Sequence, residues 1–213
     1  INKKRFILVL TEDVIETENL ANSCKTLAEL ESAVRSFDKC PLARTAKKVV
    51  FSDGNNNADL MIIGEAPGAE EDRIGLPFVG LAGELLDKML AAINCDRANT
   101  YITNIVFWRP PGNRKPTDEE IALCFPFVKQ HIILIKPKVL VLSGAVAAQA
   151  ILKTKLGITR LRGVWHKLKI AEELDEIDTV SIFHPAFLLR QPERKRETWS
   201  DLKSIKYKLN HYN

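Results

Sequence analysis

Side chains that can exchange protons or hydrogen bonds with a ligand stand at the ends of separate apolar runs in this sequence. Glu65 follows the first run, Asn104 lies within the second, and His184 follows the fourth, while the third run leads into Ser143 and Gly144. A carboxyl group, a primary amide and an imidazole can together read the donors and acceptors of a polar ligand and stabilise charge that develops on it. This chemistry requires that residues far apart in the sequence lie close together in the fold.

The apolar runs have the length and character of strands that are buried on both faces of a sheet. Helical patterns separate them, and this alternation is typical of a parallel sheet with helices on both faces. Because ligands of such sheets bind beyond the carboxyl ends of the strands, we expect the four exits to converge on one crevice. The sequence predicts a three-layer α/β/α fold with a central, mainly parallel four-stranded sheet, whose strands are residues 60–63, 101–106, 139–142 and 180–183.

Helices are expected between and around these strands. Thr117 and Glu120 have the spacing of a capping box ahead of an apolar helical pattern, which Pro126 is expected to kink or divide. The segment before residue 26 is ambiguous. The other predicted helices span about residues 26–37, 82–93 and 199–209.

Length and composition favour one globular unit. The 213 residues suffice for one buried core, and no linker-like segment divides them, so we expect a single domain over 1–213 in which residues 1–36 form an N-terminal extension or helix of uncertain role. No run reaches the roughly eighteen apolar residues of a membrane span, and we therefore expect a cytoplasmic protein, a monomer without a membrane partner. The net charge of +4 is only a faint indication of a polyanionic partner.

Five segments, taken together, resemble the uracil-DNA glycosylase superfamily, and specifically its family-4 enzymes from bacteria and archaea. In sequence order they are GEAPGAEEDRIGLPFVGLAGELLDKML, YITNIVFWRPPGNRKPTDEE, KPKVLVLSGAVAAQAIL, GITRLRG and FHPAFLLR, within a match from about Phe37 to Leu209. The resemblance implies a uracil-DNA glycosylase-like fold. It also implies a monofunctional enzyme of DNA base excision repair, which hydrolyses the N-glycosidic bond of uracil in DNA and leaves an abasic site.

The resemblance implies a pocket for a base that has been flipped out of the duplex. Phe78 is then the aromatic residue that stacks on uracil, and Asn104 reads the hydrogen-bonding edge of the base. His184 is the donor to uracil O2, where negative charge develops as the base leaves. The expected uracil pocket comprises Gly64, Ala66, Phe78 and Asn104, and the expected catalytic residues are Glu65, Asn113 and His184.

Two residues are candidates for orienting the attacking water. Family-1 enzymes place an aspartate where this chain has Ala66, so Glu65 and Asn113 are the remaining candidates. The adjoining acidic residues Glu70, Glu71 and Asp72 are expected to be solvated or paired with arginine, and we leave them outside the catalytic set.

A flipped base leaves a gap in the duplex, and the resemblance implies that Leu188 fills it as a wedge after the His-Pro motif. Phosphate contacts are expected from loops at the same edge of the sheet. The complete set of expected DNA-binding residues is Ser143, Gly144, Arg160, Arg162, Gly163, Pro185, Leu188 and Arg190.

Family-4 enzymes hold a four-iron, four-sulfur cluster with four cysteines, and this chain departs from that pattern. The corresponding positions are occupied by Phe37, Cys40, Trp108 and Cys124. Two thiolates cannot hold a cubane that needs four ligands, and the two aromatic rings are expected to fill its volume. We therefore judge these positions non-binding and expect neither a metal nor another cofactor.

Two other functions remain open. The chain could be a DNA-binding module of the same fold with weak or no catalysis, or a glycosylase for another deaminated base such as hypoxanthine or xanthine. The occupied active-site positions argue against the first alternative, and Asn104 disfavours the second.

Overall fold

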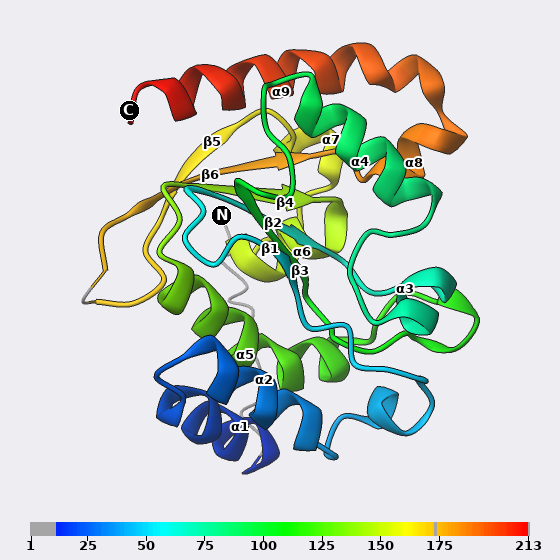
Figure 1. Cartoon of the computed structure of the whole chain (residues 1–213), viewed down its shortest axis with the longest axis vertical. Helices are drawn as coiled ribbons and strands as arrows, with labels where there is room; N and C mark the ends of the chain where they lie inside the picture. The colour runs from blue at the N-terminus through cyan, green and yellow to red at the C-terminus, as the bar shows by residue number, and fades with distance from the viewer. Residues whose placement is uncertain (1–11, 173, 213) are drawn as a thin grey trace, which may run out of the picture.

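A mixed sheet of six strands forms the centre of the computed structural model, which describes residues 12–172 and 174–212 (Figure 1). The strand order is β1-β3-β2-β4-β6-β5, and the four inner strands are parallel to one another. The strands are β1 (Asp53–Gly54), β2 (Leu60–Gly64), β3 (Thr100–Asn104), β4 (Val139–Ser143), β5 (Trp165–Leu168) and β6 (Ile177–Ile182).

The four predicted strands are the four inner ones, but the prediction of a four-stranded sheet is wrong. Two further strands lie at the edges of the sheet. Strand β1 pairs with β3 and strand β5 pairs with β6, both in antiparallel orientation. Strand β1 has two residues, and β5 has three half-buried residues and one exposed residue. Neither strand therefore has the continuous apolar run that marks a strand buried on both faces.

Helices cover both faces of the sheet. They are α1 (Glu12–Ser23), α2 (Leu27–Ser36), α3 (Ala69–Ile74), α4 (Leu81–Ala91), α5 (Asp118–Ile135), α6 (Ala145–Leu152), α7 (Ile158–Leu161), α8 (Pro185–Arg190) and α9 (Lys195–Asn210). Single 3₁₀ turns lie at Pro41–Arg44, Pro111–Asn113 and Pro192–Arg194. No helix in the described part of the chain is long and apolar enough to cross a membrane.

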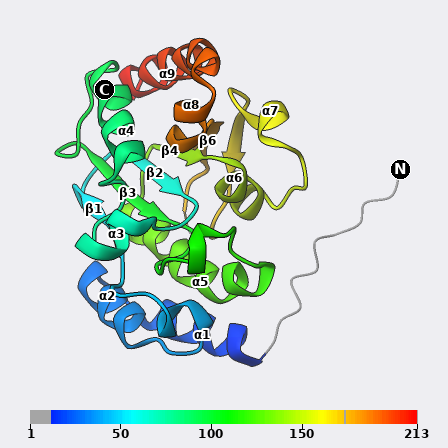
Figure 2. The ribbon, with the colours of Figure 1, turned by 90° about the vertical axis from the view of Figure 1, so that its right-hand side faces the viewer.

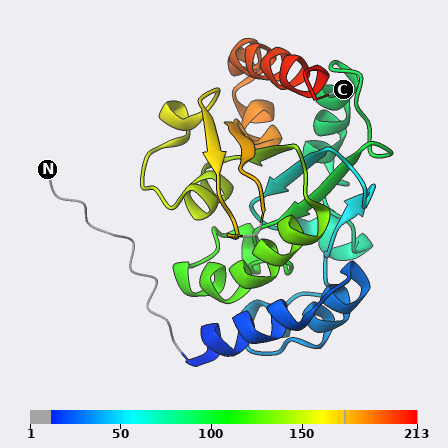
Figure 3. The same cartoon turned by 90° about the vertical axis from the view of Figure 1, so that its left-hand side faces the viewer.

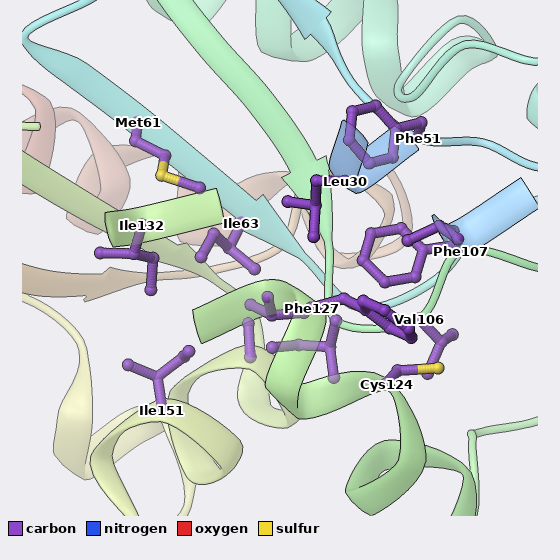
Figure 4. Close-up of a cluster of buried hydrophobic side chains, with 14 of the residues drawn as sticks. Leu30, Phe51, Met61, Ile63, Val106, Phe107, Cys124, Phe127, Ile132 and Ile151 are labelled. Atoms are coloured by element: carbon purple, nitrogen blue, oxygen red, sulfur yellow. The ribbon is translucent and has the colours of Figure 1, made fainter. Parts of the chain in front are cut away.

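Alternate residues of each inner strand supply two apolar layers. Leu60 and Ile62 of β2 face a layer formed with α4, α8 and α9, whereas Met61 and Ile63 face the layer formed with α2, α5 and α6. Figure 3 shows α9 on one side of the sheet and α5, with α1 beyond it, on the other. Figure 4 shows Met61, Ile63 and Phe127 in the second layer. The period of two in a strand explains this division.

The capping box before α5 is confirmed. The Thr117 hydroxyl accepts a hydrogen bond from the Glu120 backbone N–H (3.2 Å), and the Glu120 carboxylate accepts one from the Thr117 N–H (2.8 Å). Helix α5 continues through Pro126, so this proline does not divide it. The ambiguous N-terminal segment contains α1, which packs against α5 (Figure 2).

Candidate active site

The carboxyl ends of the inner strands bring the predicted residues together. Gly64 at the end of β2 lies beside Asn104 at the end of β3, and Ser143 of β4 lies beside Ile182 of β6. Two residues after Ile182, the chain reaches His184. The alignment of parallel strands thus places side chains from distant segments at one edge of the sheet.

Gly64 allows the side chains of Asn104 and Phe78 to approach the end of β2 closely, because it has no side chain. A Cβ atom at this position would lie 2.4 Å from Asn104 Oδ1 and 2.6 Å from the ring of Phe78, which is closer than non-bonded atoms can pack. Asn104 and Phe78 therefore both lie against the backbone of Gly64. A larger residue here would push the amide or the ring out of place.

The imidazole of His184 completes this arrangement. Its ring stacks on that of Phe78 with a centroid separation of 5.4 Å and an angle of 26° between the planes. Gly144, whose φ is +97°, has its Cα beside the His184 side chain, since a Cβ there would lie 3.1 Å from His184 Cβ. Asn104, Phe78 and His184 thus form one cluster around the ends of β2, β3 and β4.

His184 is held as a neutral imidazole with a defined tautomer. Its Nδ1 accepts a hydrogen bond from the Ala186 backbone N–H (3.1 Å), at the start of α8. Burial, together with the charge of Arg190, lowers the pKa of His184 from 6.5 to about 4. Because Nδ1 accepts, the single proton of the neutral ring is on Nε2, and this atom can donate to a ligand.

Asn104 offers the second set of polar atoms. Asn104 is 2% exposed as a residue, and its side chain makes no hydrogen bond to the described residues. Its amide atoms are not among the fully buried polar atoms that lack a partner, so they remain open to solvent. A ligand that accepts from the amide nitrogen and donates to the amide oxygen would find both atoms available.

The two candidates for water positioning differ in their surroundings. Glu65 follows Gly64 directly, and burial raises the pKa of its carboxyl group, an effect that the charge of Lys115 opposes. Asn113 lies at an exposed 3₁₀ turn, where its amide oxygen accepts a hydrogen bond from Arg109 Nε (2.7 Å). The structure therefore places Glu65 beside the cluster and leaves Asn113 on the loop after β3. Ala66, expected in the uracil pocket, is half-buried and packs against the apolar layer of α5.

The expected DNA-binding residues are not equally accessible. Arg160 and Arg190 are exposed, whereas Ser143, Gly144 and Pro185 are buried. The guanidinium group of Arg162 forms an ion pair with Asp201, with 2.9 Å between Nε and Oδ2. Gly163 packs against the same carboxylate, since a Cβ there would lie 2.6 Å from Asp201 Oδ1. Arg162 and Gly163 thus serve the packing of α9 in this conformation.

The expected wedge at Leu188 does not fit the structure. Leu188 is 1% exposed and belongs to the apolar layer between the sheet and α4, whereas its neighbour Leu189 is 42% exposed. The spacing from the His-Pro motif could not reveal this difference, because it depends on which face of the short helix α8 packs inward. Of the two leucines in this motif, Leu189 is the exposed one.

The residues at the family's cluster positions do not fit an iron–sulfur cluster. The rings of Phe37 and Trp108 stack with 6.3 Å between their centroids, and both residues are buried. Cys40 and Cys124 are fully buried, and burial raises the pKa of the Cys124 thiol. Figure 4 shows Cys124 among apolar side chains. No group of three or more potential metal-ligating side chains occurs in residues 12–172 and 174–212.

Two residues that shape the site escaped the sequence analysis. Glu71, expected in a solvated acidic run, accepts hydrogen bonds from the backbone N–H groups of Gly68, Val79 and Gly80. Arg97, which carried no motif, donates to the carbonyl groups next to and at Phe78. A signal was present only for Glu71, which stands three residues after the possible N-cap Gly68. Glu70 behaves as expected and pairs with Arg73.

The fold is that of an α/β protein, and an aromatic ring, a primary amide and an imidazole lie together at the carboxyl edge of its sheet. The family model of the uracil DNA glycosylase superfamily matches residues 51–203. Similar curated proteins include the type-4 uracil-DNA glycosylases of Archaeoglobus fulgidus (38% identical over 183 residues, 85% of this chain and 92% of the relative) and Pyrobaculum aerophilum (37% over 182 residues, 83% and 91%). The chain belongs to the type-4 uracil-DNA glycosylase family of this superfamily.

The protonation of His184 can be measured directly. We expect ¹⁵N NMR of histidine-labelled protein to show a neutral ring with the proton on Nε2 at pH 7, which titrates near pH 4. Because unfolded histidine binds its proton already near pH 6.5, the unfolded state binds more protons between these values, and the free energy of unfolding falls as the pH decreases from about 6.5 to about 4. A ring of His184 that is charged at pH 7 would contradict the assignment.

Proposed function

We propose that this chain is a monofunctional uracil-DNA glycosylase, which hydrolyses the N-glycosidic bond of uracil in DNA and leaves an abasic site for base excision repair. The observation that carries the proposal is the cluster around Gly64, in which a stacking ring, an unpartnered amide and a neutral imidazole donor lie together. Membership of the type-4 family supports the same activity. DNA that contains uracil is then the partner.

Base selection follows from the chemistry of Asn104 and Phe78. The amide oxygen can accept from uracil N3–H while the amide nitrogen donates to O4, whereas cytosine presents the reversed pattern. The Phe78 ring offers a face on which the extruded base stacks, a contact of about 1 to 3 kcal/mol. Because the imidazole plane is only 26° from that ring, a base stacked on Phe78 would lie nearly parallel to the ring of His184.

Bond cleavage leaves negative charge on the base, and His184 Nε2–H is the donor that stabilises this charge at O2. A neutral donor keeps its proton as the charge develops, and its low pKa ensures the neutral form at physiological pH. Glu65 is our candidate for orienting the attacking water, because it adjoins the cluster. Asn113 takes this role only if DNA binding releases it from Arg109.

The activity test uses a uracil-containing oligonucleotide followed by alkaline cleavage at the abasic site. We expect His184→Ala to lower the cleavage rate by about 10² to 10³, which is the effect of removing one such donor. His211→Ala is the matched control, because His211 is exposed at the end of α9. Asn104→Ala should lower the rate on uracil as well.

The same assay separates the alternatives. A wild-type protein that binds DNA but releases no uracil from single or double strands would be a binding module. Faster release of hypoxanthine or xanthine than of uracil would identify a glycosylase for another base. Either result would contradict the proposal.

We propose that Leu189, rather than Leu188, fills the gap left by the flipped base. Leu189→Ala should slow uracil release from double-stranded DNA much more than from single-stranded DNA, because only the duplex has a stack to fill. Leu188→Ala should instead lower the free energy of unfolding by about 2 to 5 kcal/mol, since this side chain is buried. Leu20→Ala in α1 is the control for an exposed leucine. Equal losses on both substrates for Leu189→Ala would argue against a wedge.

We also propose that the enzyme works without an iron–sulfur cluster, with Phe37 and Trp108 packed in its place. After anaerobic incubation with ferrous iron and sulfide, we expect the purified wild-type protein to retain no acid-labile sulfide. The double variant Phe37→Cys/Trp108→Cys restores four cysteines and serves as the positive control. Iron and sulfide that stay bound to the wild-type protein at four atoms each per chain would disprove this proposal.

The remaining proposals concern the context of the enzyme. We propose a single domain over residues 1–213 that acts as a cytoplasmic monomer. Contacts of α1 and α2 with α5 support the inclusion of the N-terminal helices in this domain. Residues 1–11 of the expected N-terminal extension lie outside the described residues.

A further inference from the structure

The backbone of Phe78 has a conformation that this residue type rarely adopts. Its φ is +54°, in the left-handed region, which is sterically unfavourable for a bulky non-glycine residue. Such a conformation persists only when the surrounding structure holds it. The contacts around the loop of residues 75–80 should therefore reveal what fixes this ring.

Arg97 holds the carbonyl side of this loop. Its guanidinium group donates from Nη1 to the carbonyl oxygen of Pro77 (3.1 Å) and from Nη2 to that of Phe78. Asp53 of β1 and Asp87 of α4 fix the guanidinium group, with 2.5 Å from Nη1 to Asp53 Oδ2 and 2.9 Å from Nε to Asp87 Oδ1. The planar group thus connects two separate elements, β1 and α4, to the backbone of Phe78.

Glu71 holds the amide side of the same loop. Its Oε1 accepts hydrogen bonds from the N–H groups of Val79 and Gly80, both at 2.9 Å, and its Oε2 accepts one from Gly68 (3.0 Å). A glutamate on a solvated surface can take its hydrogen bonds from water, whereas this carboxylate accepts three from backbone N–H groups. This side chain ties the loop to the exit of β2, where Gly64 and Glu65 lie.

Gly83 of α4 provides the third contact that holds the loop of residues 75–80. A Cβ at this position would lie 1.7 Å from the carbonyl oxygen of Phe78, so α4 approaches the loop as closely as backbone atoms allow. The carbonyl group of Phe78 therefore lies between Arg97 and the first turn of α4. The peptide units on both sides of the residue are fixed, and with them the direction of its ring.

We propose that Arg97 and Glu71 are positioning residues, which hold the strained backbone of Phe78 so that its ring is already placed for the flipped base. This inference rests on the proposed function, since it concerns how the same pocket binds uracil. A fixed ring adds stacking energy without an ordering cost at the moment of binding. Arg97 and Glu71 act through Phe78 and need not contact the base.

A double-mutant cycle tests this coupling. Arg97→Met should lower kcat/KM for uracil release by about tenfold, because a small displacement of a binding group is costly. In a Phe78→Ala background the same substitution should change kcat/KM by less than about twofold, because the ring through which Arg97 acts is gone. Losses that multiply in the double variant, or a folded Arg97→Met protein with the wild-type kcat/KM, would overturn the proposal.

Two further variants keep the test decisive. Glu71→Gln, which retains one acceptor oxygen, should lower kcat/KM less than Glu71→Ala does. If Arg97→Met does not fold, Glu71→Gln replaces it in the double-mutant cycle with Phe78→Ala. Arg73→Met is the matched control, because Arg73 is exposed on α3 and pairs with Glu70 alone in the described residues. Its kcat/KM should equal that of the wild type. A melting temperature measured for each variant separates loss of activity from loss of folding.

The order of the ring can be observed without catalysis. With 4-fluorophenylalanine incorporated at position 78, ¹⁹F NMR should give one narrow signal in the wild-type background and a shifted or broadened one with Arg97→Met or Glu71→Gln. An inactive wild-type protein with this response would refute the proposed function and leave the positioning role standing. An active protein without the response would refute the positioning role instead.

Discussion

The active site depends on the missing side chain at Gly64. Asn104 reaches this glycine because β2 and β3 are parallel and in register, and Phe78 reaches it because the loop before α4 folds back over the strand end. Sheet geometry alone would bring only the strand ends together. The absence of a Cβ lets an amide and an aromatic ring approach the same backbone atoms, an arrangement that would suit a flat, polar group.

Burial gives each group of the cluster a different chemical character. It keeps the imidazole of His184 neutral, leaves Asn104 only 2% exposed, and raises the pKa of Glu65. These effects share one cause, since an apolar surrounding disfavours charge and strengthens hydrogen bonds. A ligand that satisfies the polar groups gains more there than it would in water.

The sequence was most informative for residues at the ends of buried strands, because their position in the fold follows from the position of the strand. Asn104 and His184 were placed correctly because buried strands show continuous apolar runs, and the carboxyl ends of parallel strands meet. The burial of Leu188 could not be predicted, because spacing from a motif does not determine which face of a one-and-a-half-turn helix is buried. Arg97 carried no sequence signal, because its partners are backbone carbonyl groups whose positions depend on the tertiary fold.

The aromatic pair Phe37–Trp108 joins the loop after β3 to the helices α2 and α5, and this loop adjoins the site. Trp108 lies four residues after Asn104, and its ring stacks on Phe37, which ends α2 and also packs edge-on against Phe127 of α5. Four cysteines at these positions would join the same elements through a cluster. Aromatic packing can replace that connection because such pairs contribute about 0.5 to 1.5 kcal/mol beyond the area they bury. The loop after β3 thus stays anchored next to the amide of Asn104, which we propose reads the base.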